Sequence, residues 1–254
     1  MKRLLSGIAV LAIVMAQSAH AEVVALFEDF EDSAVAYTIT ADGSTTVEFS
    51  DGIGDFVTRI GGDSTNTVGT FYEIFGVQGS GYFGAMDTNG EPEGGDVIEL
   101  SWTGIDVSGL TDLSFSGFFA EDTDGTNEDW DDNSSFLVEA QIDGGGFVSL
   151  FAVEATGGTN SSPAVDTDFD GVGDGAAITD TLTEFSAVIG GTGSTLDLRL
   201  TISNLEAGDE DIAFDNITVA GVAAIPEPSS MAVLGLLGIG AMRSARKRRR
   251  TKNA

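Results

Sequence analysis

The sequence predicts an all-β protein, a jelly-roll-like β-sandwich. Short segments alternate apolar and polar residues with the period of two that a half-buried strand requires. The chain contains 34 Gly among 254 residues, about twice the usual share, which favours many tight turns. Few stretches carry the apolar spacing of an amphipathic helix, and the sequence shows neither a fixed-period repeat nor a parallel βαβ pattern.

The clearest element is a β-hairpin. Phe136, Val138, Ala140 and Ile142 alternate with their neighbours, and the Gly-rich residues 143–146 then turn the chain into a returning strand at 147–151. Apolar residues alternate in the same way over 196–202. The other expected strands, in chain order, are 36–40, 46–49, 55–60, 97–102, 113–119, 182–188 and 214–219, at spacings typical of a sandwich.

The charges are unevenly distributed along the chain. Basic residues gather at the two ends, and only Arg59 and Arg199 lie between residues 22 and 225. That stretch holds 40 acidic residues against these two, a net charge of −38. We call this stretch the body. Its negative charge repels nucleic acid and anionic membranes and attracts cations, so we expect no nucleic-acid partner.

The N-terminus has the three parts of a secretory signal peptide. Lys2 and Arg3 precede an apolar run at 4–16, and Ala19-His20-Ala21 offers a cleavage site of small residues. We therefore expect residues 1–21 to be removed and an exported chain to begin at Glu22. The alternative is an uncleaved transmembrane helix, although the run is shorter than the roughly 20 residues of a membrane span.

The C-terminus also has three parts: Ile225-Pro226-Glu227-Pro228-Ser229, a run of small and apolar residues to 242, and an Arg-rich tail at 243–254. Together they resemble the PEP-CTERM sorting signal of Gram-negative bacteria that make extracellular polysaccharide. The resemblance implies that residues 223–254 form the signal, with a helix at 229–242 held transiently in the inner membrane. An exosortase would then recognise Pro226, Glu227 and Pro228 and release the protein to the cell surface or beyond.

Residues 22–222 are long enough for one β-sandwich domain with a sizeable core. The chain has no Cys, and its one His, His20, lies in the signal peptide. The mature protein therefore has no Ser-His-Asp or Cys-His catalysis and no His or Cys metal site. Sites built from oxygen ligands for hard cations such as Ca²⁺ remain.

One acidic stretch, residues 166–174, resembles the D-x-D-x-D-G calcium loops of EF-hands and thrombospondin type 3 repeats. By this resemblance the ligands are carboxylates, with Gly171 allowing the sharp turn. They are Asp166, Asp168, Asp170 and Asp174. The twelfth position of the loop is Ala177, where those families place an acidic residue. The alternative is a solvated acidic loop between strands.

A second predicted Ca²⁺ site joins the two ends of the body. Asp215 shares strand parity with Ile217 and Val219, which indicates an inward-facing carboxylate in need of a cation or of donors. The layout resembles jelly-roll carbohydrate-binding modules, and by that resemblance Glu28 or Glu31 would share the ion with Asp215, joined by Asp209 or Asp211. A β-bulge or a satisfied strand end is the alternative.

A third acidic stretch, residues 121–135, surrounds Trp130. An aromatic ring among polar groups at a loop tip can stack on a sugar, so Trp130 is a candidate ligand-binding residue. The alternative is that Trp130 caps the core while the acids are solvated.

Together these observations predict an exported, Ca²⁺-dependent binding or structural module, sorted by its C-terminus and associated with exopolysaccharide. We expect it not to be an enzyme. The rival prediction is a glycoside hydrolase or polysaccharide lyase that uses paired carboxylates, because such a pair needs neither His nor Cys.

Overall fold

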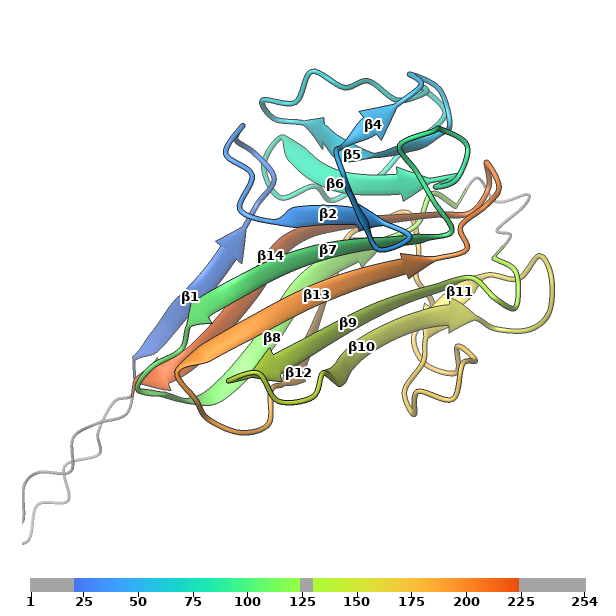
Figure 1. Ribbon diagram of the computed structural model, residues 1–254. Coiled ribbons are helices and arrows are strands. Elements are labelled where there is room, and N and C mark those ends of the chain that lie inside the picture. The colour runs from blue at the N-terminus through green and yellow to red at the C-terminus, as the bar shows by residue number, and fades with distance from the viewer. Residues whose placement is uncertain (1–20, 124–129, 224–254) are drawn as a thin grey trace, which may run out of the picture.

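The computed structural model describes residues 21–123 and 130–223, and it confirms the predicted jelly-roll-like β-sandwich (Figure 1). Within these residues, fourteen strands form two seven-stranded sheets in which every strand pairing is antiparallel. The described part of the chain contains no helix long and apolar enough to cross a membrane.

Sheet A has the order β12-β8-β14-β6-β5-β4, with β1 also paired to β14. Its strands are β1 (Glu22–Glu28), β4 (Phe49–Ser50), β5 (Phe56–Gly61), β6 (Gly81–Met86), β8 (Leu110–Ala120), β12 (Thr183–Val188) and β14 (Asp211–Ala223). Glu22 pairs with Val222, so the start of β1 and the end of β14 lie side by side (Figure 1).

Sheet B has the order β11-β10-β9-β13-β7-β2-β3. Its strands are β2 (Thr38–Ala41), β3 (Ser44–Thr46), β7 (Val97–Asp106), β9 (Ser135–Ile142), β10 (Val148–Ala155), β11 (Pro163–Val165) and β13 (Thr195–Ser203). The predicted hairpin is confirmed as β9 and β10, and Asp143 and Gly144 in its turn both have positive φ. Burial alternates along β13 as the sequence predicts.

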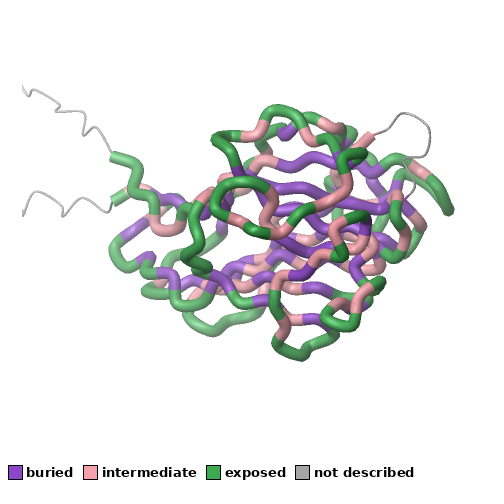
Figure 2. Tube along the Cα trace, turned by 90° about the horizontal axis from the view of Figure 1, so that it is seen from above, coloured by how far each residue is buried: buried purple, intermediate pink, exposed green. Residues whose placement is uncertain are grey.

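The main core lies between the sheets, where Figure 2 shows buried strands running through the middle of the molecule. Aromatic rings fill much of it. Phe83 and Phe214 stack with centroids 4.9 Å apart, and Phe119 and Phe151 stack at 4.5 Å. Such pairs add to the free energy gained by burying apolar area. Phe83 and Phe214 both belong to sheet A, whereas Phe119 of sheet A and Phe151 of sheet B pack across the core and hold the two sheets together.

A smaller second core covers part of the outer face of sheet A. Phe56, Tyr72, Tyr82, Met86 and Leu182 are among its members. Tyr72 and its partly buried neighbours belong to the segment between β5 and β6, so this segment packs over the sheet. As a result β6 is buried on both faces along its whole length.

Three strands were not predicted, β1, β6 and β11, and one predicted strand is wrong. The expected strand at 46–49 is divided between β3 in sheet B and β4 in sheet A. The chain crosses between the sheets at Val47 and Glu48. This crossing matters because both residues line the hollow described next.

Candidate functional site

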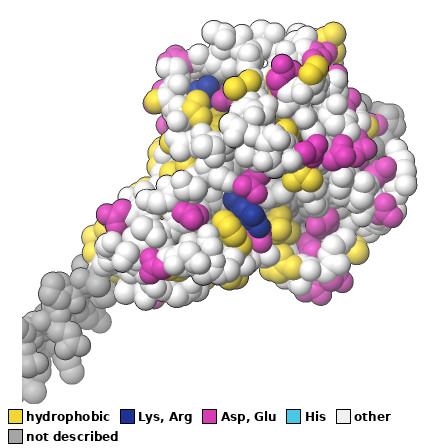
Figure 3. Space-filling view, viewed as in Figure 1, with side chains coloured by type: hydrophobic (Ala, Val, Ile, Leu, Met, Phe, Trp, Pro, Cys, Tyr) yellow, Lys and Arg dark blue, Asp and Glu magenta, His cyan; other side chains and the backbone are white. Residues whose placement is uncertain are grey.

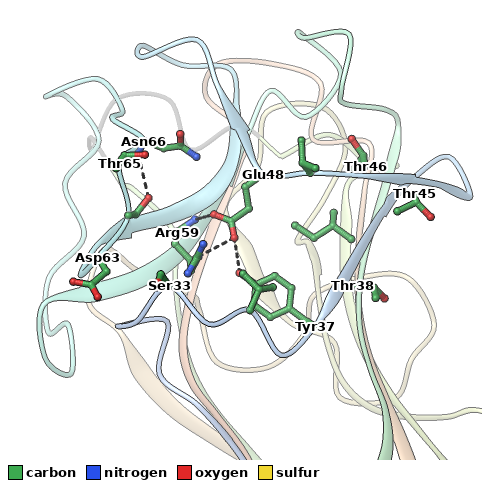
Figure 4. A pocket seen from close by; sticks show the side chains of 14 residues that line it. Ser33, Tyr37, Thr38, Thr45, Thr46, Glu48, Arg59, Asp63, Thr65 and Asn66 are labelled. Carbon is green, nitrogen blue, oxygen red and sulfur yellow. Dashed lines mark hydrogen bonds and ion pairs between the residues drawn. The ribbon is translucent and has the colours of Figure 1, made fainter.

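A hollow of about 630 Å³ lies where β2 and β3, at the edge of sheet B, approach β5 of sheet A (Figure 4). Most of its wall consists of hydroxyl, amide and aliphatic side chains. The lining residues are Ser33, Val35, Tyr37, Thr38, Ile39, Thr45, Thr46, Val47, Glu48, Arg59, Asp63, Ser64, Thr65 and Asn66. We call this space the hollow.

A network of polar side chains centred on Glu48 fixes one side of the hollow. Its Oε1 accepts hydrogen bonds from the Tyr37 hydroxyl and Arg59 Nε, both at 2.8 Å. Its Oε2 accepts from the Thr58 hydroxyl and the Arg59 backbone N–H, both at 3.1 Å. Burial and then the charge of Glu48 raise the pKa of Tyr37. With four donors on its two oxygens, Glu48 is a structural anchor rather than a free acid or base.

Local backbone features place these side chains. The crossing at 47–48 carries Glu48 under the hollow and leaves Val47 65% exposed at its surface. At the end of β5, Gly61 has φ +76°, and a Cβ there would lie 2.1 Å from the carbonyl oxygen of Ser80. Only glycine fits that position, so Gly61 turns the chain into the wall that carries Ser64 and Asn66.

Both basic side chains of the body are already neutralised. The guanidinium of Arg59 pairs with Glu48 at 2.8 Å and also donates to the carbonyl of Asp32. On the outer face of sheet B, Arg199 pairs with Glu139 at 2.7 Å and Glu99 at 3.4 Å. Acidic side chains are scattered over that face (Figure 3). The described surface therefore offers no uncompensated Lys or Arg to an anionic ligand.

The structure brings together three of the four aspartates predicted for the calcium loop. Asp166, Asp168 and Asp170 each offer a carboxylate oxygen within 4.8 Å of the others. Asp170 is the largest cause of a raised pKa at Asp168, as expected for like charges held close together. Asp174 instead accepts hydrogen bonds from the Thr167 backbone N–H and hydroxyl at 2.9 and 2.8 Å.

Asp166 is buried and organises this loop from within. Its carboxylate accepts the backbone N–H groups of Asp168, Phe169 and Gly171 at 3.2, 2.7 and 2.9 Å. Burial, and then the charge of Asp166, raise the pKa of nearby Glu154 to about 7. The loop thus concentrates negative charge, and a bound divalent cation would relieve that repulsion.

The carboxylates predicted for the second calcium site bind backbone amides. Asp215 accepts from the N–H of Gln78 and Asn216 at 3.0 and 2.7 Å, and burial raises its pKa to about 6. Glu31 accepts from the Ser80 N–H and hydroxyl at 2.6 Å and from the Gly81 N–H at 3.0 Å. Both residues therefore hold the segment just before β6.

Glu28 accepts the N–H of Phe30 at 3.1 Å, and burial raises its pKa. The ends of the body do meet, through the pairing of β1 with β14, as the prediction required. The side-chain oxygens of Glu28, Glu31 and Asp215 do not form a compact group of the kind seen at Asp166. A Ca²⁺ ion shared by these three stays a prediction.

The prediction that Trp130 stacks on a sugar is wrong. Trp130 is fully buried in the main core, and its indole N–H donates to the carbonyl of Asp211 at 3.1 Å. No face of the ring is open to a ligand. The alternative, a core-capping Trp, describes its position.

A carboxylate group that the sequence did not indicate lies beside β4 and β5. Asp51, Asp55 and Glu91 each place an oxygen within 4.8 Å of the others. Burial and then the charge of Asp55 raise the pKa of neighbouring Asp87 to about 6. These residues come from two separate segments of the chain, so no local sequence motif predicts the group.

Burial raises the pKa of Asp211 further than that of Asp215, Glu154 or Asp87. Asp211 is 1% exposed, beneath the segment that carries Tyr72, and it accepts the Asp122 N–H at 3.0 Å. Burial raises its pKa to about 8. At neutral pH Asp211 is therefore mostly protonated in the folded protein.

The predicted sorting residues Pro226, Glu227 and Pro228, the signal peptide and the C-terminal helix lie outside the described residues. No structural statement about them follows.

Comparison with known proteins gives structural similarity only. No protein-family model matches the chain, and no curated protein matches its sequence. Among solved structures, the CBM22-1 xylan-binding domain of Paenibacillus barcinonensis Xyn10C shares 13% identity, with 82% of this chain and 99% of that chain covered and a TM-score of 0.40.

Two further solved structures show the same level of similarity. The K1 cleaved adhesin domain of Lys-gingipain from Porphyromonas gingivalis W83 shares 13% identity over 76% of this chain and 96% of that chain, with a TM-score of 0.40. The Stig cyclase Fisc from Fischerella sp. TAU shares 11% identity over 80% and 100%, with a TM-score of 0.42. Similarity this distant assigns neither a ligand nor an activity.

Proposed function

We propose that this protein is an exported surface or matrix module that binds polysaccharide, with the hollow as its saccharide site. The observation that carries the proposal is the composition of the hollow. Hydroxyl and amide side chains stand next to the aliphatic Val35, Ile39 and Val47 around a preformed space. Sugars present hydroxyl groups and apolar C–H faces together, so a wall of mixed polar and aliphatic groups suits them.

The electrostatics of the hollow favour an uncharged sugar. Arg59 is committed to Glu48, and the nearby Asp63 would repel a carboxylate or sulfate. The whole body, at net −38, repels acidic polymers over a longer range. We therefore infer a neutral glycan as the ligand.

Rigidity of the site supports binding. The Glu48 network joins β5 to the segment before β2, and its donors and acceptors are paired before any ligand arrives. A preformed site loses less conformational entropy on binding. The same pairing removes Glu48 from acid–base chemistry, which favours a binding role over hydrolysis within the hollow.

Ca²⁺ has a supporting role in this proposal. We assign it to the loop at Asp166, Asp168 and Asp170, where three carboxylates already converge. The ion would stabilise the folded state by neutralising part of the local charge. Delivery to the cell surface would depend on the N-terminal signal peptide and on exosortase cleavage near Pro226.

A glycan array followed by titration calorimetry tests the proposal. The Val47→Asp variant places a charge in the hollow at a side chain that is 65% exposed, so folding should be preserved. Its matched control is Ile53→Asp, at a residue 62% exposed that lies outside the hollow.

We expect a neutral glycan to bind the unaltered chain and the control equally, and Val47→Asp to bind at least about tenfold more weakly. Equal affinity of all three proteins would show that the hollow is not the site. A reducing-sugar assay on the same glycan separates binding from hydrolysis, because steady release of reducing ends would favour the glycosidase alternative.

A further inference from the structure

Four neighbouring strands of sheet A carry two rows of outward side chains that contain no charge. The register of β12, β8, β14 and β1 aligns one row as Val188, Ser114, Ala220 and Val24, and the next as Ser186, Ser116, Thr218 and Phe27. We call these eight residues the uncharged face.

The side chains of the uncharged face point away from the core. The intervening row, Ala187, Phe115, Val219 and Leu26, packs in the main core, and side chains alternate between the two faces of a strand. Val188 is 81% exposed, Val24 56% and Phe27 55%, whereas the small side chain of Ala220 is only 3% exposed. Ser114, Ser116 and Thr218 are half-buried, and Ser186 is exposed. The side chains of Val188, Val24 and Phe27 are therefore open to solvent, and the segment that packs over the second core does not cover them.

The absence of charge here contrasts with the rest of the body, which carries 40 acidic residues. Acidic side chains border the face instead. Glu184 occupies the next outward position along β12, Asp112 lies on β8 below Ser114, and Glu22 begins β1. This rim repels polyanions and other copies of the chain, while leaving the centre neutral.

The chemistry of the face is that of a flat sugar-binding surface. Hydroxyls of Ser116, Ser186 and Thr218 form a row that ends at the exposed ring of Phe27. The Thr218 hydroxyl donates to the Asn216 carbonyl and keeps its acceptor lone pairs free for a ligand. A ring beside hydroxyls offers apolar contact to the C–H face of a sugar and hydrogen bonds to its hydroxyl groups.

Its size favours a polymer chain over a second copy of this protein. A stable protein–protein interface uses about 20–30 residues on each side, and the face offers eight. Four strands at about 4.8 Å spacing give a width of roughly 14 Å between the outer strands, which suits an extended chain of a few sugar rings.

We propose that the uncharged face binds a neutral polysaccharide as a second contact surface, separate from the hollow. The two surfaces share no residue, so this inference stands independently of a sugar site in the hollow. Two contact points on one module would let it bridge polymer chains or hold one chain with higher avidity.

Affinity electrophoresis of the full chain in gels containing hydroxyethyl cellulose or neutral β-glucan tests this, with polygalacturonate as the anionic polymer. The variants are Ser186→Asp, at an exposed position of an edge strand, and Phe27→Ala. Val47→Asp in the hollow and Ile53→Asp outside both surfaces serve as matched controls. Circular dichroism checks that each variant is folded.

We expect at least one neutral polymer to retard the unaltered chain, and both face variants to lose at least about fivefold in affinity for it, while Ile53→Asp does not. The Val47→Asp variant should keep the part of the affinity that the face supplies. Polygalacturonate should not retard the protein. The proposal is overturned if neither neutral polymer retards the unaltered chain, or if both folded face variants bind as tightly as it does. It is also overturned if sedimentation shows a dimer that Ser186→Asp dissociates.

Discussion

Replacing Asp211 by Asn should flatten the dependence of stability on pH. Burial raises the pKa of the Asp211 carboxyl to about 8 in the folded protein, against roughly 3.9 in an unfolded chain. When folding raises the pKa of a carboxyl, the group stabilises the folded protein fully at pH values below its pKa in the unfolded chain. That stabilisation is lost as the pH rises through its pKa in the folded protein. The loss from this group therefore spans about pH 4 to pH 8.

The expected magnitude follows from the uptake of one proton on folding. Within that window each pH unit lowers the free energy of unfolding by about 1.4 kcal/mol, so a rise from about pH 5 to pH 7.5 removes about 3 kcal/mol. Asn carries no charge, and its side-chain oxygen can still accept the Asp122 N–H that now donates to Asp211 at 3.0 Å. The variant should thus lack this contribution.

Urea unfolding at about pH 5 and about pH 7.5 measures the difference. Fluorescence reports unfolding well because Trp102 and Trp130 are both buried. Asp132→Asn, at an exposed residue, controls for the loss of one negative charge. If Asp211→Asn loses as much stability over this range as the unaltered protein and the control do, the assignment of a protonated, buried Asp211 is wrong.

Three further predictions concern the hollow, the core and the calcium loop. Arg59→Met should lower the free energy of unfolding by about 3 kcal/mol, because it leaves the nearly buried Glu48 without its counter-charge; an unchanged urea midpoint would contradict this. Trp130→Phe should lower the free energy of unfolding by about 2 kcal/mol and leave glycan affinity unchanged. A loss of glycan binding without a loss of stability would show that Trp130 belongs to the ligand site. Ca²⁺ should raise the melting midpoint more than NaCl of equal ionic strength does, and at 100 times Kd it should increase the free energy of unfolding by about 2.7 kcal/mol. The double variant Asp168→Ala, Asp170→Ala should lose that gain. Identical melting in Ca²⁺ and in chelator would show that the loop binds no Ca²⁺.

The sequence allowed the sandwich and most of its strands to be predicted because one face of those strands is solvated. β9 and β13 alternate in burial along nearly their whole length. β6 was missed for the opposite reason, since it is buried on both faces and so shows no alternation. β1 was not among the strands expected from alternation, because its exposed Val24 and Phe27 obscure the period.

Asp215 shows how one residue of irregular backbone changes an inference. The prediction that its side chain faces inward with Ile217 is wrong, although Asp215 is buried. Asn216 has φ +50°, and the register with β8 shifts between Asp215 and Thr218. Phe214 and Ile217 both face the main core, so Asp215 lies on the outer face, covered by the segment that carries Gln78.

The hollow was not predictable from any single motif. Its wall comes from β2, β3 and β5, from the segments before β2 and after β5, and from the crossing after β3. One signal was available: Arg59 is one of two basic residues in a body of 40 acidic ones, and a lone cation in such a setting needs a partner. Pairing it with Glu48 required the crossing between sheets, which local periodicity does not reveal.

Whether the hollow binds a neutral saccharide is tested by a crystal structure of the protein with a glycan selected on the array. We expect sugar density in the hollow, with hydrogen bonds from Thr or Asn side chains of its wall, apolar contact with Val47, and the Arg59–Glu48 pair intact. An empty hollow, with the glycan bound at saturating concentration elsewhere on the molecule, would contradict this expectation.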